Sequence, residues 1–346
     1  DDVSFSAGKG FMIMLLSIAL ILILGMILGW LCQKCKLPSL LGMMFTGVIL
    51  GPYVFDCIAT SILSISSEIR KIALIIILTR AGLSLDVSGL KKIGRPAVLM
   101  CFVPASFEIM GMILFAPRLL GLSILESAII GAVLAAVSPA VVVPRMVKLT
   151  EEGYGTKKGI PQLILAGASV DDVYVIVLFT TFISVIQGNG VSAMQLVNIP
   201  VSIMLGVFIG LGSGWLFSKY FERVHVRDTI KILLMLSWSF ILVTIEDSLN
   251  TPIKFSALIA IMFMGVGLQN YRKEASIRLS CKYNKLWVGA EVFLFVLVGA
   301  AVNINYLGNV GTKAIIVIAG VLVFRMLGAF VCLLQSNFNM RERVFS

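Results

Sequence analysis

The stretch GASVDDVY, residues 167–174, places two adjacent aspartates in a run that carries no other charged residue between Leu163 and Val185. A single carboxylate at the centre of a membrane helix costs roughly 2.5 kcal/mol or more. Two in succession therefore indicate a functional site. At 100° per residue Asp171 and Asp172 point in different directions, so that one can face a cavity while the other meets a protein partner.

The composition around this stretch is that of a polytopic all-α membrane protein. The 346 residues are 59% hydrophobic and only 13% charged. Apolar segments of about 20 residues, each long enough to cross about 30 Å of hydrocarbon, recur along the chain. The pattern predicts eleven spans, at residues 10–33, 38–56, 69–88, 96–116, 123–147, 161–187, 194–218, 230–246, 252–269, 286–306 and 312–335.

The net charge of +10 follows the loops between these spans and does not indicate a nucleic-acid partner. Alternate loops and the C-terminal tail hold 20 of the 28 Lys and Arg residues, and the opposite side holds 6. Because cytoplasmic loops are enriched in Lys and Arg, the N-terminus is predicted outside and residue 346 in the cytoplasm. We expect a lipid bilayer as partner, in a plasma membrane or a bacterial inner membrane.

The other deep charges supply partners for the aspartates. Arg80 and Arg325 lie inside predicted spans, and Glu108 lies near the middle of another. An arginine in hydrocarbon requires a carboxylate partner. Pairing both arginines leaves one of the three acids over, and such a group can carry a proton in one half-cycle and a bare cation in the other.

Prolines predict an interrupted helix near these charges. Pro139 and Pro144 lie five residues apart in one span, which no unbroken helix accommodates without unpaired backbone groups. We expect a discontinuous helix near Ser138, whose half-helix ends present partial charges to a small ion. Pro104, one turn before Glu108, predicts a kink there as well.

Glycines at four-residue spacing mark two further helix faces. Gly25 and Gly29 lie in the first span, and Gly206, Gly210 and Gly214 lie in the seventh. Small residues at this spacing let two helices approach closely. Packing within the chain and a contact between subunits both satisfy the pattern.

No cofactor is expected. The six cysteines show no metal-ligand grouping with His225, the one histidine of the chain. Cys32 and Cys35 form a Cys-x-x-Cys pair at a helix end, for which we expect no redox or metal role. A haem or zinc enzyme is excluded, and we expect no enzymatic activity.

Several motifs together closely resemble the NHA-type sodium/proton antiporters of the monovalent cation/proton antiporter superfamily. They are Arg80-Ala-Gly-Leu, Val137-Ser138-Pro139-Ala-Val-Val-Val-Pro144, Gly153-Tyr-Gly155, Lys158-Gly159-Ile-Pro161 and residues 167–172. The resemblance implies two inverted repeats, an elevator-type movement and a homodimer. It divides the chain into a dimerisation part, about 1–60 and 190–270, and an ion-carrying core, about 69–187 and 286–335.

The resemblance also implies roles for single residues. Asp172 matches the obligatory ion and proton carboxylate, Asp171 matches its acidic neighbour, and Arg325 matches a basic position for which Glu108 is the expected partner. The family architecture of about thirteen spans leads us to expect two more helices after residue 346.

The sequence therefore predicts antiport of Na⁺ or Li⁺ against H⁺, with Asp172, Asp171 and the Ser138 hydroxyl as oxygen ligands of the dehydrated cation. Exchange of K⁺ for H⁺, a cation channel of related fold and a sodium-coupled organic-anion transporter stay open as alternatives. An intramembrane aspartyl protease fits less well, because its two aspartates face one another from separate helices.

Overall fold

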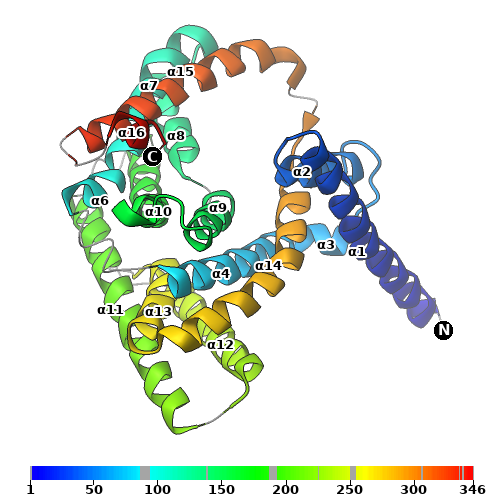
Figure 1. The fold of residues 1–346 in the computed structure, drawn as a ribbon. Coiled ribbons are helices and arrows are strands. Elements are labelled where there is room, and N and C mark those ends of the chain that lie inside the picture. The colour runs from blue at the N-terminus through cyan, green and yellow to red at the C-terminus, as the bar shows by residue number, and fades with distance from the viewer. Residues whose placement is uncertain are drawn as a thin grey trace. The chain divides into compact units, whose positions relative to one another are not determined.

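A computed structural model describes residues 2–85, 94–137, 139–186, 193–224, 226–249, 255–304, 307–334, 336 and 339–345. The described residues form helices and connecting segments, and none of them lies in a strand (Figure 1). The predicted all-α class is confirmed. The chain divides into two compact units, residues 1–76 with 284–311 and residues 77–283 with 312–346.

The first unit is built around the N-terminal helices. It contains α1 (Asp2–Lys34), α2 (Ser39–Leu50), α3 (Thr60–Ser64), the start of α4 (Ser66–Ser84) and the end of α14 (Lys273–Ala300). A Cβ added at Gly25 would lie 2.7 Å from a methyl group of Val292, and one at Gly47 would lie 1.9 Å from the Val296 carbonyl oxygen. These glycines therefore let α1 and α2 approach α14 closely.

The second unit holds all the predicted site residues. It contains the remaining parts of α4 and α14 and most of α15 (Leu307–Leu333), whose residues 307–311 belong to the first unit. Its other helices are α6 (Arg95–Met100), α7 (Val103–Leu120), α8 (Ile124–Ala135), α9 (Pro139–Glu151), η1 (Thr156–Lys158), α10 (Ile160–Ile186), α11 (Ala193–Arg223), α12 (Asp228–Ser248), α13 (Ala257–Tyr271) and α16 (Met340–Phe345). In Figure 1, α8 and α9 lie beside α10, which they contact.

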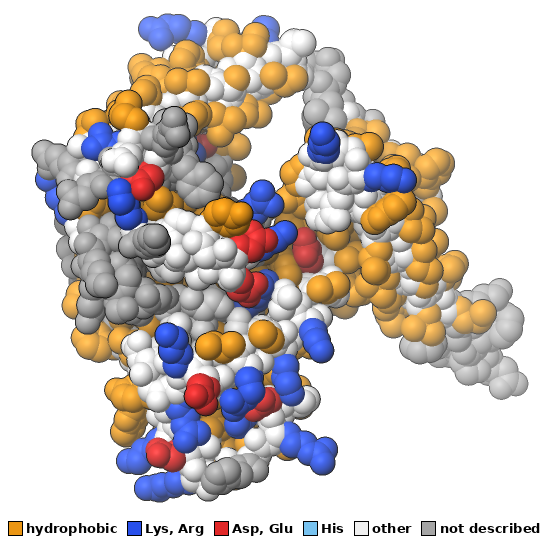
Figure 2. Space-filling model, viewed as in Figure 1, with side chains coloured by type: hydrophobic (Ala, Val, Ile, Leu, Met, Phe, Trp, Pro, Cys, Tyr) orange, Lys and Arg blue, Asp and Glu red, His pale blue; other side chains and the backbone are white. Residues whose placement is uncertain are grey.

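The surfaces of the long helices suit a lipid environment. Six segments in the described residues are long and apolar enough to cross a membrane: 12–34, 95–120, 200–223, 228–248, 273–300 and 311–333. Large apolar side chains such as Ile315, Leu322 and Met326 of α15 are exposed, and hydrophobic side chains cover much of the visible surface in Figure 2. The complete count of eleven spans stays a prediction.

Besides the interrupted fourth and fifth spans described below, two predicted spans have an end that lies well away from the end of the observed helix. The second was predicted at residues 38–56, but α2 ends at Leu50, because Gly51 and Pro52 stop the helix. The tenth was predicted at residues 286–306 after a basic loop, but α14 already begins at Lys273. The basic residues of that segment share the helix with a buried face of Ser276, Leu279 and Tyr283.

The glycine series of α11 packs within the chain. A Cβ added at Gly206, Gly210 or Gly214 would lie 2.8, 2.4 or 2.4 Å from a carbonyl oxygen of the segment that leads into α13 or of α13 itself. These glycines therefore allow α11 to pack closely on α13 within the chain. From the sequence alone, a contact between subunits is an equally possible explanation.

Candidate functional site

The acid pair lies in the middle of α10. This helix begins just after Gly159, which has φ +69° and ends η1, and Pro161 occupies its first turn, where a missing amide hydrogen costs nothing. The Asp171 side chain is 5% exposed, about 16 Å along the axis from the start of α10 at 1.5 Å per residue. The backbone at Asp172 is helical, but the side chain of this residue lies outside the described ones.

The predicted interruption of the helix before α10 is present. Helix α8 ends at Ala135, Ala136 is extended with φ −64° and ψ 116°, and α9 begins at Pro139. Ser138 lies outside the described residues. Pro139 is the first residue of α9 and Pro144 lies inside this helix. Between α8 and the end of α9 the described backbone is therefore interrupted once, before Pro139.

A second interruption lies between α6 and α7, the helix that carries Glu108. Helix α6 ends at Met100 and α7 begins at Val103, with Pro104 in its first turn. The predicted kink near Glu108 is therefore a short break. Met100 packs against α10, because a Cβ added at Gly167 would meet its side chain at 3.1 Å.

Arg325 of α15 joins three elements at this place. Its Nη1 forms an ion pair with Glu108 Oε2 and donates a hydrogen bond to the Ala135 carbonyl at 3.0 Å, while its Nη2 lies 3.6 Å from Asp171 Oδ2. The Glu108 and Asp171 side chains are each 5% exposed and the Arg325 side chain is 22% exposed. One guanidinium therefore faces two buried carboxylates and the last carbonyl of a half-helix.

Close packing of α7 against α15 lets Arg325 reach Glu108. A Cβ added at Gly111 would lie 3.0 Å from Phe324, and one at Gly328 would lie 2.9 Å from Phe107. These two glycines lie within four residues of the ion pair, one on each helix. A larger side chain at either position would separate the two charges.

A cavity of about 260 Å³ adjoins the charged groups. Asp171 and Arg325 lie on its wall with mostly apolar neighbours. Met100 at the first helix break and Val137 at the second also line it. The cavity thus connects both interruptions with the acid of α10.

The described ion pair of Arg80, on α4, is formed with a residue outside the Arg325 cluster. Arg80 Nη2 lies 3.8 Å from Glu151 Oε1, at the end of α9, and the two side chains are 6% and 60% exposed. Sequence reasoning missed Glu151, because it assigned this residue to the loop after the fifth span. The pair connects α4 with the second half-helix.

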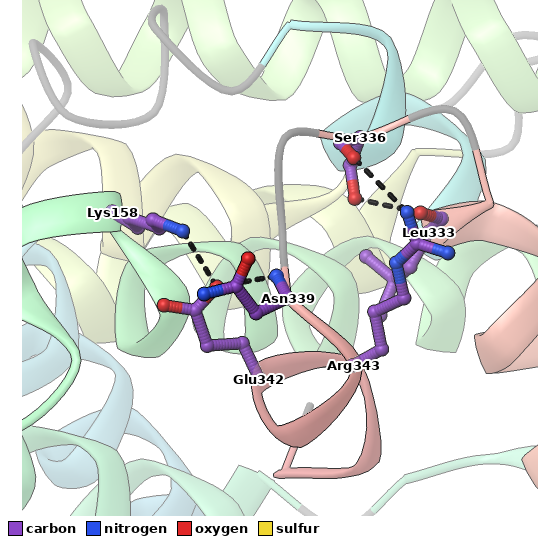
Figure 3. A network of polar contacts seen from close by, with 6 residues as sticks. All are labelled: Lys158, Leu333, Ser336, Asn339, Glu342 and Arg343. Atoms are coloured by element: carbon purple, nitrogen blue, oxygen red, sulfur yellow. Dashed lines mark hydrogen bonds and ion pairs between the residues drawn. The ribbon is translucent and has the colours of Figure 1, made fainter.

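A polar network joins η1, which precedes α10, and the segment that follows α15 to α16 (Figure 3). Lys158 Nζ donates to Glu342 Oε2 at 2.7 Å, and the Asn339 amide donates to the same oxygen at 2.7 Å. Arg343 donates to the Ser336 carbonyl at 3.2 Å. The hydrogen bond from Lys158 holds the pKa of the Glu342 carboxyl below its ordinary value. The network thus joins the segment before Asp171 to the segment after Arg325.

Comparison with known proteins assigns this arrangement to a family. The sequence model described as "Sodium/hydrogen exchanger, transmembrane" matches residues 5–346. The chain is 33% identical over 319 residues to human "Sodium/hydrogen exchanger 9B2", covering 89% of this chain and 58% of the relative. It is 31% identical over 317 residues to mouse "Sodium/hydrogen exchanger 9B1", covering 89% of this chain and 55% of the relative. The chain therefore spans somewhat more than half the length of these relatives.

The fold is also that of a solved structure. The sodium proton antiporter MjNhaP1 from Methanocaldococcus jannaschii, at pH 8, superimposes with a TM-score of 0.80 at 20% sequence identity. The superposition covers 97% of this chain and 82% of the other. This match confirms the predicted antiporter fold, and the discontinuous helix is seen in the break between α8 and α9.

Proposed function

Because the chain belongs to the transmembrane sodium/hydrogen exchanger family, we propose that it exchanges Na⁺, or Li⁺, for H⁺ across the membrane. The observation that carries this proposal is the charge balance around Arg325. Two carboxylates, Glu108 and Asp171, share its single guanidinium. Together with Asp172, the next residue in the chain, these carboxylates carry more negative charge than the single positive charge of Arg325 balances. A small cation or protons can neutralise the excess.

The surroundings of the cluster support a small, hard cation as the cargo. The last carbonyls of α8 carry the negative end of the half-helix dipole, and they lie beside the cavity that Asp171 lines. Carboxylate and carbonyl oxygens are the ligands that hard cations prefer. In this proposal Asp172 binds the dehydrated Na⁺ with help from Asp171 and the Ser138 hydroxyl.

Competition between the cation and protons for the same carboxylate makes the exchange obligatory. A carrier that crosses the membrane loaded with one or the other moves them in opposite directions. We propose an elevator-type movement of the ion-carrying core, residues 69–187 and 286–335, against a dimerisation part, residues 1–60 and 190–270, within a homodimer. Arg325 and Glu108 would stay paired through the cycle, and Arg80 with Glu151 would hold α9 in place.

Proton flux in proteoliposomes that contain the full-length protein tests the proposal. A pH dye inside the vesicles should report proton movement on addition of Na⁺ or Li⁺, and Asp172→Asn should abolish it. Asp56→Asn is the matched control, because Asp56 is exposed in a loop with φ +49°, a conformation that asparagine adopts readily. Sodium-dependent proton flux that persists in Asp172→Asn contradicts the assignment.

The same preparation separates the alternatives. A response to K⁺ in place of Na⁺ identifies a K⁺/H⁺ antiporter. Currents far above carrier turnover in a bilayer recording identify a channel, and sodium-dependent uptake of a labelled carboxylate identifies an organic-anion transporter.

A further inference from the structure

A hydroxyl pair outside the charged cluster joins α7 to α10. Tyr174 Oη lies 2.7 Å from Ser106 Oγ, and Ser106 Oγ lies 2.8 Å from the Phe102 carbonyl oxygen. Because a serine hydroxyl has one proton, which the carbonyl must receive, the tyrosine is the donor to Ser106. The chain of hydrogen bonds therefore runs in one direction, from α10 to the break between α6 and α7.

The ring of Tyr174 is also held by its neighbours. It meets the Phe102 ring edge to face, with centroids 5.3 Å apart and an interplanar angle of 81°. It packs against a buried apolar cluster that contains Ile109, Ala135 and Val175. The ring is thus fixed by packing, and the hydroxyl by a hydrogen bond, at one place on α7.

The contact between Tyr174 and Ser106 lies close in sequence to Asp171 on α10 and to Glu108 on α7. Tyr174 follows Asp171 by three residues, so the two lie about 60° apart around α10. Ser106 precedes Glu108 by two residues on α7. A contact that fixes α10 against α7 at Tyr174 therefore also fixes the rotation at which the Asp171 carboxylate comes within 3.6 Å of the Arg325 guanidinium.

We propose that Tyr174 and Ser106 are positioning residues, which hold α10 in the rotation that keeps Asp171 beside Arg325 and so set the cation affinity of the exchanger. The proposal rests on the proposed exchange function. Without the hydroxyl contact, α10 turns more freely and the acid pair is less well preorganised for the cation. Tyr174→Phe keeps the ring packing and removes only the donor.

The expected effect is a loss of affinity. One hydrogen bond corresponds to roughly a three- to tenfold change in an equilibrium constant, so Tyr174→Phe should raise the half-saturating Na⁺ concentration by about that factor and change the maximal rate less. Ser106→Ala should do the same, because it also breaks the chain of hydrogen bonds. Ser106→Thr keeps a hydroxyl and should restore the wild-type affinity. The pH profile of exchange should shift in the two hydroxyl-deficient variants, because protons compete with Na⁺ for the same acids.

Tyr283→Phe is the matched control. Tyr283 is fully buried and its hydroxyl donates to the Ile232 carbonyl at 3.4 Å, on helices other than those of the cluster. This variant should lose stability without a change in Na⁺ affinity or pH profile. A role of Tyr174 in folding alone would give the same pattern as Tyr283→Phe.

The experiment measures flux in proteoliposomes and, in parallel, the rise in melting temperature of the full-length protein in detergent on titration with Na⁺. Unchanged half-saturation of both signals in Tyr174→Phe and Ser106→Ala overturns the inference. An equal shift in Tyr283→Phe also overturns it. A wild-type protein that binds Na⁺ but exchanges no protons refutes the proposed function instead, and the binding titration of the variants still decides the role of Tyr174.

Discussion

At Arg325 one guanidinium contacts carboxylates from two helices and a main-chain carbonyl from a third. Its removal leaves Glu108 and Asp171 buried close to one another without their shared counter-charge. Breaking a buried ion pair from one side is strongly destabilising, because the remaining charge has lost its compensation. Arg325 is therefore as important for the stability of the second unit as for the charge balance of the site.

We predict that Arg325→Ala lowers the free energy of unfolding by about 3–5 kcal/mol and that adding Glu108→Gln recovers part of this loss. Thermal melting of the purified protein in detergent measures both effects. Arg118→Ala is the control, since Arg118 lies on the same α7 as Glu108, is exposed, and its described hydrogen bond goes to a carbonyl of its own helix. Equal melting temperatures for wild type and Arg325→Ala would contradict the stabilising role of the pair.

Single residues differ in how far the sequence could predict their contacts. The need of Arg325 for a carboxylate partner was predictable, because a charge in an apolar helix requires an opposite charge. The choice of Glu108 among the three deep acids came from the family resemblance. The hydrogen bond to the Ala135 carbonyl was not predictable, because every residue has a carbonyl and the sequence does not say which one a helix break exposes. The contact of Tyr174 with Ser106 was missed because serine and tyrosine carry no comparable requirement for a specific partner.

Helix boundaries, like residue contacts, were predictable only where the local sequence constrains the backbone strongly. The break between α8 and α9 followed from the prolines, since a missing amide hydrogen and a fixed φ act on the backbone directly. The start of α14 at Lys273 was missed because Lys and Arg were counted as loop residues. They lie on a helix whose opposite face buries Leu279 and Tyr283, and this three- to four-residue apolar spacing was the available signal.

The α11–α13 crossing gives a test at the scale of helices. A Cβ added at Gly210 would lie 2.4 Å from the Ala260 carbonyl oxygen and 2.7 Å from Phe263 Cβ, whereas one at Gly212 meets nothing within 4 Å. We predict that Gly210→Ala lowers the free energy of unfolding by about 1–3 kcal/mol, because the helices must move apart. Gly212→Ala should leave it unchanged or raise it by up to about 1 kcal/mol, through helix propensity. Melting temperatures in detergent compare the two, and equal effects would contradict the assigned helix contact.

The orientation of the whole molecule rests on the distribution of Lys and Arg between alternate loops. With 20 basic residues on one predicted side and 6 on the other, the richer side is predicted to lie in the cytoplasm. The native cysteines provide the probes that decide it, because Cys35, Cys57 and Cys281 are free and exposed.

We predict that a membrane-impermeant maleimide applied to intact cells labels Cys57, which follows α2 on the predicted outer side, and spares Cys35 and Cys281 on the basic side. Variants that keep one of these three cysteines, with the other five cysteines replaced by serine or alanine, make each signal specific. Permeabilised cells should label all three positions, which shows that the thiols are accessible. Labelling of Cys35 or Cys281 from outside, with Cys57 protected, would reverse the orientation.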